Sequence, residues 1–83
     1  MLGVKTFHLT ITSVTGAQFD GAAESATVPG SAGEMTILSN HEPLVTTLKS
    51  GRITVRNSGE NKTFDIESGV LECSGGGRVT VLL

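Results

Sequence analysis

The stretch RITVRNSGENKTFDIE, residues 52–67, decides the fold of this chain. In each half of the stretch, apolar side chains alternate with polar ones, and a polar run that contains Gly59 separates the halves. A period of two places alternate side chains on one face of a β-strand, and a glycine-containing polar run between two such strands is typical of a hairpin. The stretch therefore predicts a β-hairpin with one buried face.

Charge matching predicts how the two strands of this hairpin align. Val55 opposite Phe64 places apolar side chains together on the inner face, and the same alignment places Arg52 opposite Glu67 on the outer face. Directly opposite residues interact most strongly in an antiparallel pair, so opposite charges favour this register.

The rest of the chain repeats the same pattern. Residues 6–12 alternate like a half-buried strand, residues 78–83 form a closing strand, and residues 44–48 are either a short strand or an irregular extended segment. Turn signals recur throughout, among them Asp20-Gly21 and Pro29-Gly30. This punctuation, without apolar residues at helical spacing, predicts an all-β fold, a small antiparallel β-sandwich of about 8–10 short strands.

Length and composition limit what the chain does. With 83 residues, it is predicted to form a single domain over residues 1–83 whose function lies on a surface, an edge or a loop. The net charge is −2, no basic run occurs and aromatic residues are scarce, which argues against a nucleic-acid partner. We expect neither a leader sequence nor direct membrane insertion, because no segment reaches the ~20 apolar residues that span a bilayer.

Candidate chemical motifs are weak when taken one at a time. His41-Glu42-Pro43 lacks the second histidine of a zinc-protease helix, and the proline opposes such a helix. No serine-hydrolase elbow occurs, and two histidines with one cysteine are too few for a metal site. We expect Cys73 to be a buried thiol and His8 to be a solvated or hydrogen-bonded side chain. The residues predict no catalytic, cofactor or metal site, and binding is the default function.

Three stretches in order carry a resemblance to a known family. They are FDGAAESATVPGSAGEMTIL (19–38), NHEPLVTTLKSG (40–51) and SGVLECSGGGRVTVL (68–82). This pattern resembles the N-terminal β-sandwich of the epsilon subunit of F-type ATP synthases, called delta in mitochondria, over nearly the whole chain. The chain departs from the family at Thr36–His41, where Gly-Ile-Leu-Pro-Gly-His is usual. The family's C-terminal helical hairpin, with its inhibition of hydrolysis and its ATP binding, is not carried over.

The resemblance implies a non-catalytic rotor subunit in the central stalk. Such a subunit contacts the gamma subunit and the polar loops of the c-ring, couples proton flow to ATP synthesis, and works as a peripheral subunit at the cytoplasmic face of the bacterial inner membrane. It needs no cofactor and no small-molecule substrate. A stand-alone β-sandwich module that binds another protein is the alternative. The partner-contact residues are expected to be Glu34, Met35, Leu38, His41, Glu42, Leu44 and Val45. For the four apolar residues of this set, a place in the domain's own core is as well supported by the sequence as a place in the contact.

Overall fold

The computed structural model describes residues 5–83, so the first residues, which bear on the expected absence of a leader, lie outside it. The described residues form nine β-strands and contain no helix, which confirms the all-β class. The strands are β1 Phe7–Ser13, β2 Gly16–Ala23, β3 Ser25–Gly30, β4 Gly33–Leu38, β5 Leu44–Leu48, β6 Gly51–Asn57, β7 Glu60–Ile66, β8 Gly69–Cys73 and β9 Arg78–Leu82. Residues 44–48, left open by the sequence, are thus a strand.

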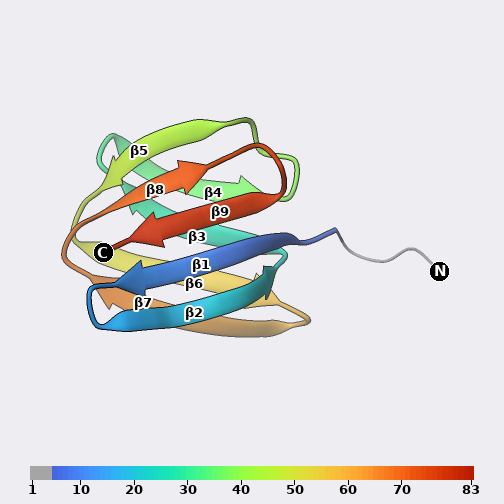
Figure 1. Ribbon diagram of the computed structural model, residues 1–83, viewed down its shortest axis with the longest axis horizontal. Coiled ribbons are helices and arrows are strands. Elements are labelled where there is room, and N and C mark those ends of the chain that lie inside the picture. Colours follow the sequence, from blue (N-terminus) through green and yellow to red (C-terminus); the bar gives the residue numbers. More distant parts are fainter. Residues whose placement is uncertain (1–4) are drawn as a thin grey trace.

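One curled sheet makes both layers of the sandwich (Figure 1). Its hydrogen-bonded order is β2-β1-β9-β8-β5-β3-β6-β7, with β4 paired to β3. We call β2, β1, β9, β8 and β5 the front layer, and β4, β3, β6 and β7 the back layer. The layers are joined where Gly30 of β3 pairs with Leu48 of β5. Every strand pair is antiparallel except β1 with β9. Strand β9 lies between β8 and β1, antiparallel to β8 and parallel to β1.

The core lies between the two layers and follows from the alternation in the sequence. In β1, Phe7, Leu9 and Ile11 are buried, whereas His8 between them is exposed. Within residues 5–83, fifteen hydrophobic residues make up the buried core, and burial of each large side chain contributes about 1.5–3 kcal/mol. Cys73 belongs to this core, as expected, and no charged or polar side chain among the described residues is buried there. The core is therefore closed, and function must lie on the outer faces, edges or loops.

The predicted register of the β6–β7 hairpin is wrong by two residues. Val55 pairs with Lys62 instead of Phe64, and Arg52 pairs with Asp65 instead of Glu67. A shift of two residues leaves every side chain on its predicted face, because the strand period is two. The Arg52 guanidinium still meets a carboxylate, since Nε donates to Asp65 Oδ1 at 3.0 Å.

Turn geometry caused this error in register. The hairpin closes through Ser58 and Gly59 alone, with φ of 54° and 78°. Two central residues with positive φ form a type I′ turn, whose twist matches that of the flanking strands. Charge pairing on an exposed face is worth too little to overrule that turn.

Two predicted turns lie inside strands. Asp20-Gly21 continues β2, where the two residues pair with Thr10 and Leu9 of β1. Pro29-Gly30 continues β3, and the turn follows at residues 31–32. Glycine is compatible with a strand when no side chain is needed to cover the core, so the glycine signal alone misplaced both turns.

Candidate partner-binding surface

The outer face of the front layer carries a group of exposed apolar side chains. Val70 of β8 lies directly opposite Leu82 of β9, and Val45 lies on the neighbouring strand β5. Val45 is 67% exposed, Val70 39% and Leu82 53%. We call these three residues the front patch. Val70 and Leu82 adjoin directly, whereas Val45 lies opposite the exposed Glu72 and diagonal to Val70. Adjoining exposed apolar side chains on a sheet face are typical of a protein-binding surface.

Threonines border the front patch along the sheet. Thr47 of β5 lies opposite Val70, and Thr12 of β1 lies beside Leu82 in the parallel pair. A row of four side chains therefore crosses four strands, with the apolar pair at its centre. This arrangement gives the face an apolar middle and a polar margin, as protein interfaces have.

The other end of the front face is polar. His8 Nε2 donates a hydrogen bond to Asp20 Oδ1 at 2.5 Å, and the Thr10 hydroxyl donates to the same oxygen at 3.2 Å. These two hydrogen bonds hold the pKa of the Asp20 carboxyl below its ordinary value, and the bond from His8 has the larger effect. Arg78 of β9 lies beside His8 in the parallel pair and adds a weaker effect of the same sign on that pKa. The front face thus changes from apolar to charged along its strands.

The outer face of the back layer is mostly polar, although Leu38 at the end of β4 also lies on it and is 51% exposed. Thr36, Thr27, Thr54 and Thr63 form one row across β4, β3, β6 and β7. The first two share a hydrogen bond of 3.2 Å between their hydroxyls. Because, among the residues that the structure describes, only the front face carries adjoining exposed apolar side chains, the two faces are not equivalent as docking surfaces.

The contact residues predicted from the sequence all lie along one edge of the sandwich, formed by β4, the loop 39–43 and β5. Met35 and Leu44 are half-buried and pack against the core. Leu38, which is 51% exposed, and Val45 face the solvent. The remaining predicted residues are Glu34, exposed at the start of β4, and His41 and Glu42 in the loop after it.

The loop 39–43 is held by its own backbone. His41 N–H donates to the Leu38 carbonyl oxygen at 3.1 Å, and the His41 ring Nδ1 donates to the Glu42 carbonyl oxygen at 2.9 Å. The Cys73 thiol makes a weak contact of 3.9 Å with the His41 carbonyl oxygen. Pro43 packs closely on Gly75, where an added Cβ would lie 2.7 Å from the proline ring. His41 therefore shapes the loop through backbone contacts.

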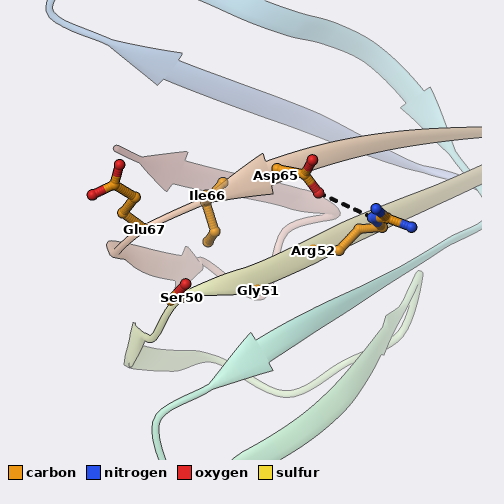
Figure 2. A pocket seen from close by; sticks show the side chains of 6 residues that line it. All are labelled: Ser50, Gly51, Arg52, Asp65, Ile66 and Glu67. Carbon is orange, nitrogen blue, oxygen red and sulfur yellow. Dashed lines mark hydrogen bonds and ion pairs between the residues drawn. The ribbon is translucent and has the colours of Figure 1, made fainter.

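The hollows on the described surface are open, and they do not bring together side chains that could form a catalytic or metal-binding site. One of them, of about 590 Å³, lies over the start of β6 and the end of β7 (Figure 2). Its Arg52–Asp65 ion pair is solvated, and Figure 2 shows the Glu67 carboxylate pointing away from that pair. Within residues 5–83, no three histidine, cysteine or acidic side chains gather as metal ligands, and no helix is long and apolar enough to cross a membrane.

Sequence reasoning missed Val70 and Leu82. Both alternate with buried neighbours, Leu71 and Val81, so the period of two already placed them on the outer face. What the sequence did not show is that β8 and β9 are adjacent, which brings these two outward side chains together.

A family model described as the ATP synthase delta/epsilon chain β-sandwich domain matches residues 6–83. This chain belongs to that family. The ATP synthase epsilon chain of Caulobacter vibrioides is 34% identical to it over 62 residues, which cover 75% of this chain and 72% of that one. ATP synthase epsilon chain 1 of Methylococcus capsulatus is 37% identical over 68 residues, covering 81% of this chain but 49% of the relative.

Solved structures share the epsilon-type fold. A chain in the cryo-EM structure of the Euglena gracilis mitochondrial ATP synthase, comprising OSCP, F1 and the c-ring, superposes with a TM-score of 0.87 at 23% identity, over 99% of this chain and 52% of that chain. A chain in the central stalk and c-ring structure of the Tetrahymena thermophila mitochondrial enzyme gives 0.78 at 15% identity, over 98% and 65%. This chain therefore spans about half to two thirds of its structural neighbours' length.

Proposed function

We propose that this chain is a non-catalytic central-stalk subunit of an F-type ATP synthase, which rotates with the gamma subunit and the c-ring and couples proton flow to ATP synthesis. The observation that carries the proposal is the front patch on a domain of the epsilon family. Because the described residues offer a closed core and open hollows, the chain acts by binding its neighbours.

The front face binds the gamma subunit in this proposal. Val45, Val70 and Leu82 supply apolar area that is buried only when a partner covers it. Removal of this area from water drives association, and the threonines around it form the polar rim. Val45 lies on β5, at the corner between the front face and the β4–β5 edge, so it contacts both neighbours.

The β4–β5 edge faces the polar loops of the c-ring. Glu34 lies near the start of β4 and Glu42 in the loop before β5, and both pair with basic side chains of the c-ring loops, while Leu38 and His41 lie between them in the sequence. Each exposed ion pair contributes only ~0–1 kcal/mol, so the carboxylates set the orientation more than the affinity. As part of such a complex, the chain is peripheral to the membrane, at its cytoplasmic face in a bacterium.

Association with the gamma subunit tests the proposal. The purified chain is mixed with gamma from the same cell, and binding is measured by calorimetry. Leu82→Asp is expected to weaken binding at least about tenfold, because it buries a charge in the centre of the contact. Val14→Asp is the matched control, since Val14 is fully exposed on the β1–β2 turn outside the front patch.

Three outcomes contradict the proposal. Failure of the unmodified chain to bind gamma favours the alternative, a stand-alone β-sandwich module. Equal weakening by Val14→Asp and Leu82→Asp shows that the front patch is not the contact. Turnover of a substrate by the purified chain would contradict the non-catalytic role.

A further inference from the structure

One carboxylate lies among the apolar side chains of the front patch. Glu72 of β8 is exposed, lies directly opposite Val45 of β5, and follows Val70 by two residues on the same strand. Strand β8 lies between β5 and β9 (Figure 1), and on the β9 side Glu72 is opposite Thr80, which precedes Leu82 by two residues. Side chains two residues apart on a strand share one face, so apolar side chains flank the Glu72 carboxylate along β8 and across to β5.

The described residues do not neutralise the charge of Glu72. The ion pairs within residues 5–83 involve Asp20 and Arg52, and neither pair includes Glu72. Asp20 is the other carboxylate on the outer face of the front layer, and it accepts hydrogen bonds from His8 and Thr10. Solvent therefore hydrates the exposed Glu72 carboxylate in the free chain, whereas neighbouring side chains already hold Asp20.

A partner that covers the front patch must also cover Glu72. Removal of an ionised carboxylate from water opposes binding strongly, unless a positive charge and hydrogen-bond donors take the place of the water. A purely apolar partner surface would leave this carboxylate buried and unpaired. A surface with a basic side chain at the matching position would not. Glu72 thus discriminates between partners, because an unpaired buried charge penalises the wrong one.

We propose that the gamma subunit places a basic side chain, arginine or lysine, against Glu72, and that this ion pair determines which partner the front patch accepts. The inference rests on the proposed function, because it concerns the surface by which the chain binds gamma. The gamma surface then carries apolar side chains on both sides of the basic one, over Val45 on one side and over Val70 and Leu82 on the other. Arginine suits this position, because its guanidinium is weakly hydrated and donates two parallel hydrogen bonds to a carboxylate.

Substitution of Glu72 tests the ion pair by the sign of its effect. Binding to gamma from the same cell is measured by calorimetry for the unmodified chain, Glu72→Gln and Glu72→Lys. With a basic side chain opposite, Glu72→Gln leaves that side chain unpaired and weakens binding at least about tenfold, and Glu72→Lys brings like charges together and weakens it further. Without a basic side chain opposite, Glu72→Gln binds as tightly as the unmodified chain or more tightly, because no carboxylate loses its water.

Glu67→Lys is the matched control. It makes the same change in net charge as Glu72→Lys, at an exposed residue that follows β7 of the back layer. We expect it to bind gamma within about threefold of the unmodified chain, since surface charges far from the contact are largely screened. Glutamine has nearly the shape of glutamate, so Glu72→Gln decides the matter even if Glu72→Lys fails to fold, and circular dichroism checks the fold of each variant.

The inference is overturned if Glu72→Gln binds gamma as tightly as the unmodified chain, if Glu72→Lys binds no more weakly than Glu72→Gln, or if Glu67→Lys weakens binding as much as Glu72→Lys does. In these cases the unmodified chain still binds gamma and Leu82→Asp still weakens that binding, so the proposed function stands. If the unmodified chain does not bind gamma, the proposed function fails, and this inference fails with it.

Discussion

Ser58→Asn should stabilise the domain, because the β6–β7 turn holds a residue poorly suited to its backbone. Ser58 has φ of 54° and is the one non-glycine residue with positive φ among those described. Asparagine is several-fold enriched in this conformation, which corresponds to about 0.5–1 kcal/mol, and Asn-Gly is the favoured pair for a type I′ turn. The Ser58 N–H donates to Glu24 Oε2 at 3.1 Å, and this backbone bond remains in the variant.

Thermal unfolding measures the effect. The chain has no tryptophan or tyrosine, so unfolding is best followed by far-ultraviolet circular dichroism or calorimetry. For a domain of this size, a gain of 0.5–1 kcal/mol raises Tm by about 2–8 °C. Ser58→Ala is the control: it keeps the Cβ at positive φ without the local side-chain hydrogen bonding of asparagine, and we expect no gain. An unchanged or lower Tm for Ser58→Asn, or an equal rise for Ser58→Ala, would refute the reasoning.

Two further predictions test packing and electrostatics. Gly51→Ala should destabilise the domain by about 1–3 kcal/mol in denaturant unfolding, because its Cβ would lie 2.9 Å from the Pro29 Cβ. Gly76→Ala, which meets open space, should stay within about 0.5 kcal/mol of the unmodified chain, and equal losses in the two variants would contradict the packing argument. The lowered pKa of Asp20 stabilises the fold above the ordinary value of 3.8, and this contribution disappears as pH falls through the folded-state value. Asp20→Asn should therefore lower Tm at neutral pH but not in strong acid, and a Tm difference that persists below the folded-state pKa would rule this out.

In the proposed function, different surfaces of the sandwich bind different partners. The front face carries apolar area for one partner, the β4–β5 edge carries the carboxylates and the shaped loop for another, and the back face is polar apart from Leu38 at that edge. This division places both proposed contacts on one side of the domain, since Val45 lies at the corner that they share.

Local sequence predicted the strands well where side-chain alternation was regular. β1, the β6–β7 hairpin and β9 follow directly from it, because a half-buried strand needs nothing more than a period of two. The turn predictions at Asp20-Gly21 and Pro29-Gly30 failed, because glycine is compatible both with a turn and with an uncrowded strand position.

The sequence by itself determined that this chain is all-β, which side chains face inward, and to which family it is similar. Only the tertiary structure decided that β8 and β9 bring Val70 and Leu82 together and that β9 pairs parallel with β1. The physical reason is that alternation is a property of each strand alone. Adjacency depends on which strands pair across long separations in the chain, and no local pattern encodes that choice.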